Sequence, residues 1–285
     1  MRIDLHTHSS VSDGTQPPGQ LVRAARAAGL DVIALADHDT VDGWTEAEAA
    51  ALQVGLDVVP AIEVSTSWRS ADVHLLAYWP DPGDPRLVAM LAAIREGRRR
   101  RVPRMLERLA AHGIELTEAD VRRAAGAAAS VGRPHVADAL VAAGVVGSRD
   151  EAFASWIGEG RPGHVSKPAP DLVDALATVA AAGGVSVLAH PWGRGSRRVL
   201  DEETLVTLAG VGLDGLEVDH VDHDDGDRAE LRRIAATAHL VVTGGSDYHG
   251  DGKAGVPLGM FSTSEPAYRA LRERRGDVRP PVRTT

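Results

Sequence analysis

The sequence contains no cysteine among its 285 residues. This absence excludes a disulfide framework, zinc sites built on thiolates and cysteine nucleophiles. Any metal chemistry must therefore depend on histidine and carboxylate side chains. Lysine is almost absent as well, since only Lys167 and Lys253 occur. Arginine must then supply most of the side-chain cations that recognise anionic ligands, through its bidentate fork.

Long hydrophobic runs and an excess of positive charge are also missing. No stretch of about 18 apolar residues exists that would predict a membrane span, and the N-terminal segment MRIDLHTHSS has no apolar core of a signal peptide. We therefore expect a cytoplasmic protein that does not bind membranes. Lys and Arg number 31 against 40 Asp and Glu, which gives a net charge of −9. This balance argues against a general polyanion binder, and we expect no stable binding to duplex DNA.

Short apolar runs alternate with Ala- and Leu-rich amphipathic stretches. Strand–helix alternation of this kind predicts an α/β fold with a largely parallel sheet, as a barrel or a doubly wound sheet. The helical stretches lie near 18–28, 42–54, 170–182, 201–210 and 227–238. The predicted strands are Ile3–Leu5, Val32–Ala36, Val58–Ile62, Val73–Ala77, Val185–Ala189, Leu213–Val218 and Leu240–Thr243.

The alternation stops between residues 84 and 168, where only helices are predicted. These helices are a long one from Pro85 to about His112, followed by 117–125, 134–143 and 149–157. The pattern predicts a helical insertion that divides one barrel into two parts. We assign residues 1–97 and 168–285 to the barrel and 98–167 to the insertion, which would cap the substrate. The Arg- and Pro-rich tail from about residue 270 is expected to be partly loose.

Histidine is abundant, with 12 residues, and several follow predicted strands. His6 and His8 have the i, i+2 spacing that puts two side chains on one face of a strand. Asp37, His38 and Asp39 follow the next strand, a costly concentration of polarity unless it binds something. Further ligand-type residues at or near other strand ends, or in the loop after the first strand, are Asp13, Glu63, His74, His190, Asp247 and His249.

The carboxyl ends of parallel strands meet on one face of a barrel, where active sites are built. Six imidazoles and three carboxylates would therefore meet there: His6, His8, Asp13, His38, Glu63, His74, His190, Asp247 and His249. With cysteine absent, this set suits Zn, Mn or Fe, and nine ligands exceed the needs of one ion. The sequence therefore predicts a multinuclear metal site.

The segments that carry these residues resemble the PHP (polymerase and histidinol phosphatase) family of metal-dependent phosphoesterases. They are DLHTHSSVSDG, LADHDT, AIEVS, DVHLLAY, LAHPWG and GSDYHG, and they occur in this order over both halves of the chain. The insertion segments GRPHVADALVAAG and EAFASWIGEGRPGHV resemble a bacterial subgroup that contains 3′,5′-nucleoside bisphosphate phosphatases and 5′-end exoribonucleases. The resemblance implies a distorted (β/α)₇ barrel of the PHP type with a helical insertion.

The resemblance also implies which residues hold two to three divalent ions, Mn, Zn or Fe. A first ion would take His6, His8, Glu63 and Asp247. A second would share Glu63 and add His74 and His190. A third, which would complete a trinuclear site, would take Asp13, His38 and His249. All nine are expected to act in catalysis through the bound metals.

Clustered divalent ions suit phosphoester hydrolysis, because they supply a bridging hydroxide at neutral pH and neutralise the phosphate oxygens. We expect an enzyme that acts on small nucleotides such as 3′,5′-nucleoside bisphosphates, or on short RNA 5′ ends. The alternatives are a cyclic-nucleotide or cyclic-phosphate phosphodiesterase, a histidinol-phosphate phosphatase, and a noncatalytic metal-stabilised PHP module. A hydrolase of C–N bonds is a further alternative, although no lysine lies near a strand end in the first half of the chain.

Recognition of the substrate phosphate requires a cation besides the metals. Arg133 and His135 are the first candidates, and the resemblance points to them as a clamp on a second phosphate. Arg194 follows a predicted metal-bearing strand, and Lys167 lies in the return linker. We interpret residues 219–227, which include His220 and His223, as a solvated acidic loop outside the ligand set.

Overall fold

The computed structural model describes residues 1–126, 132–166, 169–253 and 255–275. The chain forms two compact units, and each has its own hydrophobic core. The first unit combines residues 1–91 with 170–285, and the second comprises residues 92–169. No helix in the described residues is long and apolar enough to cross a membrane.

The first unit is built on a seven-stranded sheet in which the strands follow one another in chain order. Most neighbouring pairs are parallel, as the strand–helix alternation predicts. The strands are β1 (Ile3–Thr7), β2 (Val32–Leu35), β3 (Asp57–Trp68), β4 (Ala71–Tyr78), β5 (Val185–Leu188), β6 (Gly215–Asp219) and β7 (Val241–Gly244). The sheet nearly closes on itself, because the Asp247 N–H after β7 donates to the His6 carbonyl of β1 at 2.8 Å. This confirms the α/β barrel of the PHP type.

Strand β4 is antiparallel to both of its neighbours. Only Arg69 and Ser70 separate it from β3, too few residues for a crossover helix, and both adopt positive φ in a tight turn. As a result β4 begins at the edge of the barrel where the parallel strands end. His74, opposite Ser65 of β3, is thereby placed at that edge although it lies in the first half of its strand.

Alternate residues of the strands fill the barrel interior, as the two-residue period of a strand requires. This interior cluster includes Leu5, Ala34, Leu76, Tyr78 and Val187. Helix α10 (Glu265–Arg274) contributes Tyr268 and Leu271 to the same cluster. The first residues of the tail that was expected to be partly loose, up to Arg274, therefore belong to this helix, which Leu271 anchors. The later part of that tail, 276–285, lies outside the described residues.

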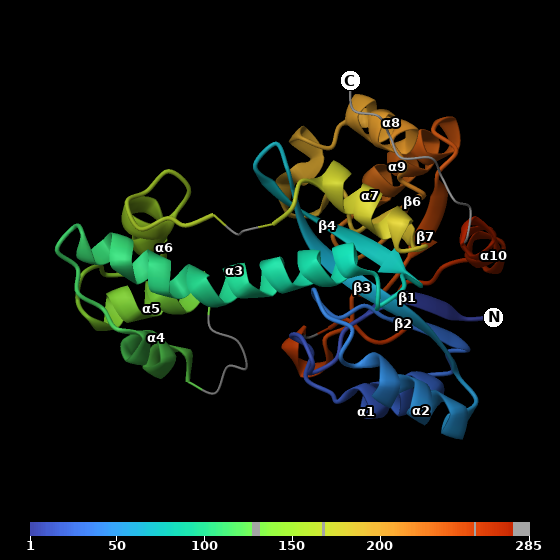
Figure 1. Cartoon of the computed structure of the whole chain (residues 1–285), viewed down its shortest axis with the longest axis horizontal. Helices are drawn as coiled ribbons and strands as arrows, with labels where there is room; N and C mark the ends of the chain where they lie inside the picture. The colour runs from blue at the N-terminus through green and yellow to red at the C-terminus, as the bar shows by residue number, and fades with distance from the viewer. Residues whose placement is uncertain (127–131, 167–168, 254, 276–285) are drawn as a thin grey trace. The chain divides into compact units, whose positions relative to one another are not determined.

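Helices cover the outer face of the barrel. Helices α1 (Pro18–Ala27) and α2 (Trp44–Val54) lie together next to β2 and β3, and α7, α8 and α9 lie on the opposite side of this unit (Figure 1). The bounds of these three are Leu172–Ala181, Glu202–Gly210 and Asp225–Thr237, and each begins after an aspartate that caps its first turn. Two short 3₁₀ helices follow β5 and β7, at Gly193–Arg198 and Gly250–Gly252.

The second unit is helical. Helix α3 (Pro85–Ala110) begins in the first unit and ends in the second. It is followed by α4 (Glu118–Ala125), α5 (Arg133–Ala142), α6 (Arg149–Ala152) and the π-helix Phe153–Ile157. Met105, Leu109, Val121, Leu140 and Ile157 are fully buried and form the core of this unit. The helix positions agree with those that the sequence predicts.

The two separate cores predict that one unit can be weakened without the other. Leu140→Ala removes a fully buried side chain from the helical unit and should destabilise it by about 2–5 kcal/mol. Amide hydrogen exchange should accelerate in residues 92–126 and 132–166, while β1–β7 keep their protection. Leu76→Ala, in the barrel cluster, should instead accelerate exchange in β1–β7 and leave the helical unit protected. Equal loss of protection in both units for either variant would contradict this division.

Candidate metal centre

The nine side chains predicted as ligands lie at one end of the barrel. Each is held by a strand or by the loop that follows one, so the sheet register determines where each side chain begins. His6 lies in β1, Glu63 in β3 and His74 in β4. The others follow strand ends: His8 and Asp13 after β1, His38 after β2, His190 after β5, and Asp247 and His249 after β7.

Four buried residues form the first group of potential ligands, namely His6, His8, Glu63 and Asp247. The Nε2 atoms of His6 and His8 lie 3.3 Å and 3.2 Å from Glu63 Oε2. The same two atoms lie 3.5 Å and 3.2 Å from Asp247 Oδ1. This is the set expected for a first ion.

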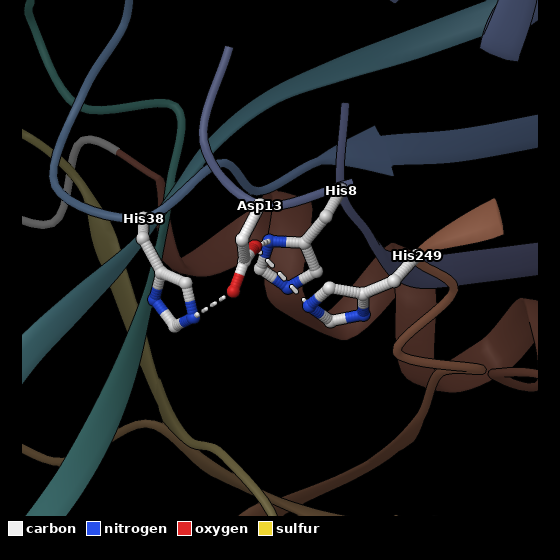
Figure 2. Close-up of side chains that lie close together, drawn as sticks. All are labelled: His8, Asp13, His38 and His249. Atoms are coloured by element: carbon white, nitrogen blue, oxygen red, sulfur yellow. Dashed lines mark ion pairs between the residues drawn. The ribbon is translucent and has the colours of Figure 1, made fainter. Parts of the chain in front are cut away.

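The second group lies at the rim, around Asp13, whose side chain is 43% exposed. Figure 2 shows the Asp13 carboxylate between His38 and His249, with His8 behind it. Asp13 Oδ1 lies 3.2 Å from His249 Nε2, and Oδ2 lies 3.6 Å from His38 Nε2. His8 joins this group through Nδ1, 3.6 Å from Asp13 Oδ1. The group therefore contains the three residues expected for a third ion, with His8 added.

Glu63 connects the remaining histidines. Its Oε1 lies 2.7 Å from His74 Nδ1 and 3.2 Å from His190 Nε2. Its Oε2 faces His6, His8 and also His38, whose Nδ1 is 3.2 Å away. One carboxylate thus contacts five imidazoles, with a different set at each oxygen. The third group that can surround an ion consists of His38, Glu63 and His74. His190, which was expected beside Glu63 and His74, contacts the same Glu63 oxygen as His74.

Several buried ring nitrogens at this centre make no hydrogen bond. They are His6 Nε2, both nitrogens of His8 and His38 Nδ1. An unsatisfied buried polar atom costs about 1–3 kcal/mol, so four in one place require an explanation. Divalent cations would supply it, because neutral imidazole nitrogens and carboxylate oxygens are their protein ligands. The residues present therefore fit a metal centre.

The electrostatics of the site show how strongly it favours added positive charge. Burial lowers the pKa of His8, but the Asp247 and Glu63 carboxylates outweigh it and raise that pKa to about 10. Burial would raise the pKa of Glu63, yet the surrounding imidazoles, His38 and His74 first, hold it well below its usual value. The pKa of Asp247 is lowered in the same way by His6, against the effect of burial. Protons on imidazoles thus balance the carboxylates where cations would bind.

Three buried aspartates that are not predicted ligands tie the ligand-bearing loops to the barrel. Asp37 accepts hydrogen bonds from Ser9 and Ser12 in the loop that carries Asp13. Asp39 accepts from the backbone and hydroxyl of Ser65, two residues after Glu63.

Asp4 ties the segment after the last strand, β7, to the barrel. It accepts hydrogen bonds from the backbone and hydroxyl of Ser246, next to Asp247, and from the His6 N–H. Sequence reasoning identified Asp37 and Asp39 as a polar cluster that must bind something but did not identify their partners. It missed Asp4 entirely, although a charged residue inside an apolar strand was a usable signal.

Backbone strain also gathers at this end of the barrel. Asp39, His190 and Asp247 have φ values of 56°, 28° and 52°, a left-handed region that costs a residue with a side chain about 1–3 kcal/mol. The Asp247 N–H donates to the His6 carbonyl at 2.8 Å and the Asp39 N–H to the Glu63 carbonyl at 3.2 Å. Hydrogen bonds to neighbouring strands thus hold the backbone of Asp39 and Asp247 in this conformation.

The loop after β6 is exposed at most of its positions, as its interpretation as solvated predicts, but its two histidines are not. His220 and His223 are buried, with 0% and 2% exposure. His223 Nδ1 donates to the Val218 carbonyl, and its Nε2 accepts the N–H of Trp192 at 3.2 Å. His223 therefore joins two loops and has no nitrogen left for an ion. The burial of the two histidines was not predicted, because the same segment contains acidic residues such as Asp224 and Asp225, which are exposed.

The candidate phosphate-binding residues fall outside these groups. Arg133 and His135 lie at the start of α5 in the helical unit. The Arg133 guanidinium lies over the ring of Phe153, 5.2 Å from its centroid. Arg194 belongs to the 3₁₀ helix after β5, but its side chain is not among those described. Lys167 lies outside the described residues.

Known proteins resemble this chain along most of its length. Residues 4–116 match the model of the PHP domain. A 3′,5′-nucleoside bisphosphate phosphatase from Chromobacterium violaceum is 34% identical, and the match covers 94% of both chains. A 5′-3′ exoribonuclease from Haemophilus influenzae is 33% identical over 87% of this chain and 90% of its own.

A solved structure supports the same relationship. It is described as a metal-dependent phosphoesterase from Bifidobacterium adolescentis and is 40% identical, with a TM-score of 0.78 over 97% of each chain. The barrel, the clusters of potential metal ligands and these similarities lead to one conclusion: the chain belongs to the PHP domain family and is a metal-dependent hydrolase of phosphate esters.

Proposed function

We propose that this hydrolase removes phosphate from small nucleotides that carry two phosphates, such as a 3′,5′-nucleoside bisphosphate, or acts on the 5′ end of a short RNA. The observation that carries the proposal is the contact of Glu63 with five imidazoles beside two further carboxylates. That arrangement suits several cations close together, and phosphate esters are the substrates that clustered cations serve best. The two curated relatives described above act on such molecules.

The nine predicted residues would hold two to three ions of Mn, Zn or Fe. His6, His8, Glu63 and Asp247 would hold the first, and Glu63 with His74 and either His38 or His190 the second. Asp13, His38 and His249 would hold a third. Bound ions would supply Lewis-acid stabilisation of the phosphate oxygens and activation of water. The protein itself provides the positions of the donors, since the aspartate–serine hydrogen bonds keep the loops in place.

Arg133 and His135 would bind the second phosphate, and the helical insertion would cap the substrate. His135 Nδ1 accepts the N–H of Gly132 at 3.0 Å. A neutral ring therefore carries its proton on Nε2, which can be donated to a phosphate oxygen. Stacking on Phe153 restricts the Arg133 side chain, so less conformational entropy is lost when it binds an anion. Arg194 and Lys167 remain further candidates for the same task.

The proposal predicts selective phosphate release. The Mn-loaded protein should release phosphate from adenosine 3′,5′-bisphosphate much faster than from AMP, and removal of metal by a chelator should abolish activity. Loss of a residue that only orients a metal ligand costs roughly 10–100-fold in activity. Glu63→Gln alters a proposed ligand itself and should lower kcat/KM by at least that factor. Glu230→Gln on α9, which alters a surface pair with Arg233, is the matched control. Activity on a cyclic phosphate instead of the bisphosphate would favour the phosphodiesterase alternative.

The second-phosphate clamp predicts a substrate-dependent effect. Arg133→Ala should raise KM for the bisphosphate about 10-fold or more, as expected when a charge-assisted pair is lost. Turnover of an aryl phosphate, which has no second phosphate, should change little. Arg149→Gln provides a control in the same unit, because Arg149 pairs with Asp138 on the surface. Equal losses on both substrates would rule out the clamp.

Metal binding should release protons. The pKa of His8 is about 10 and that of His6 lies well above its usual value, so both rings are protonated at pH 7 without metal. A cation that binds at either ring must displace a proton, so its affinity should rise as the pH rises toward 10. Calorimetry in buffers of different ionisation enthalpy should detect about one to two protons released for the first ion. His112→Gln, a change at an exposed ring, should leave that number unchanged, and a value of zero would contradict the assignment.

A further inference from the structure

Strand β6 is the one barrel strand to which no metal ligand is assigned. Two buried ionisable side chains nevertheless lie in this strand or directly after it. Glu217 lies in the strand and His220 directly after it, with 1% and 0% exposure. Buried charged groups are costly unless every polar atom has a partner. The partners of both Glu217 oxygens and of His220 Nε2 are residues of the proposed ligand set.

Both carboxylate oxygens of Glu217 contact segments that carry proposed metal ligands. Oε1 lies 2.9 Å from His6 Nδ1, and Oε2 accepts the backbone N–H of His190 at 3.0 Å. A carboxylate can only accept hydrogen bonds, so His6 Nδ1 carries a proton and donates it. In the neutral ring the lone pair is then on Nε2, the atom that faces Glu63 Oε2 and Asp247 Oδ1. Glu217 therefore turns the binding atom of His6 toward the proposed ion.

His220 acts on Asp247 in a corresponding way. Its Nδ1 accepts the backbone N–H of Asp222 at 3.0 Å, so the neutral ring carries its proton on Nε2. That atom lies 3.3 Å from Asp247 Oδ2. Lys253 Nζ lies 2.7 Å from the same oxygen. Oδ1, which faces His6 and His8, is thus the oxygen left to bind a cation.

Close packing at Gly245 supports the precision of this arrangement. A Cβ atom at Gly245 would lie 2.4 Å from the Cβ of His6 and 2.9 Å from Glu217 Oε1. Only a residue without a side chain allows the end of β7 to pass this close to the His6–Glu217 pair. The backbone between β7 and Asp247 therefore packs directly against the His6–Glu217 pair.

We propose that Glu217 and His220 are positioning residues of the metal centre. They select the ring nitrogen of His6 and the carboxylate oxygen of Asp247 that face the first ion, and they are not ligands themselves. This inference rests on the ligand set given under the proposed function. Strand β6 then serves the ligands of other strands: Glu217 acts on His6 of β1 and on His190 after the neighbouring strand β5, and His220 acts on Asp247 after the neighbouring strand β7.

The test measures metal binding directly. Glu217→Gln has one oxygen and one NH₂ group, so it cannot accept from both His6 Nδ1 and the His190 N–H. It should weaken binding of the first Mn²⁺ ion about 10–100-fold, as measured by competition with a fluorescent chelator. It should also change the visible absorption of the Co²⁺-substituted protein, because the geometry around the ion changes. Glu230→Gln, the surface variant on α9, should alter neither.

His220 offers a pair of variants that separates positioning from simple packing. His220→Gln places an amide NH₂ where Nε2 lies and can still donate to Asp247 Oδ2, whereas His220→Leu fills similar space without a donor. We expect His220→Gln to retain most of the Mn²⁺ affinity and His220→Leu to lose about 10-fold or more. Equal affinity in the two variants would overturn the role of His220, even if Glu217→Gln does not fold well enough to be measured.

A parallel variant distinguishes this inference from the proposed function. Glu63→Gln alters a proposed ligand and must weaken Mn²⁺ binding if the ligand set is right. If Glu63→Gln weakens binding while Glu217→Gln and His220→Leu do not, the positioning role is wrong and the ligand set stands. If Glu63→Gln has no effect, the ligand set itself fails. Thermal unfolding of the metal-free variants shows whether a loss of affinity merely reflects a loss of folded protein.

Discussion

The contact of one buried carboxylate with five imidazoles is the constraint on which this end of the barrel depends. Glu63 is 1% exposed, and its two oxygens face different histidines. A carboxylate in such a place is stable only while positive charge surrounds it, from protons or from cations. Four strands bring that charge, because His6 and His8 come from β1 and the other three histidines from β2, β4 and β5. The stabilisation of Glu63 therefore depends on the pairing of these strands in one sheet.

Much of this was predictable from local patterns. The i, i+2 spacing of His6 and His8 and the apolar run before His38 place their side chains at strand ends. Parallel pairing then requires those ends to meet. His74 was harder to place, since its position follows from the reversal of β4 and not from a strand end. The short connection at Arg69 and Ser70 was the signal for that reversal.

The partners of individual oxygen and nitrogen atoms could not be predicted. Spacing along the chain shows which edge of the sheet a residue occupies, but not which atom a neighbouring strand will meet. Asp37 and Asp39 therefore looked like residues of a binding site, although each holds a neighbouring segment by hydrogen bonds. His223 was expected in a solvated loop, but it contacts Val218 of β6 and Trp192 in the loop after β5. These contacts depend on tertiary packing, which the sequence pattern does not contain.

The three aspartate–serine connections have a consequence for the choice of metal. Asp4, Asp37 and Asp39 hold the loops through hydrogen bonds within the protein, so the donor atoms do not need an ion to bring them together. Little of the binding energy of an ion is then used to order the chain. A preorganised set of nitrogen and oxygen donors would impose its own spacing on an ion that binds, so geometry and ligand type would contribute to selectivity beside the availability of the metal. The three aspartates would then influence which divalent ion the site prefers, although none of them touches it.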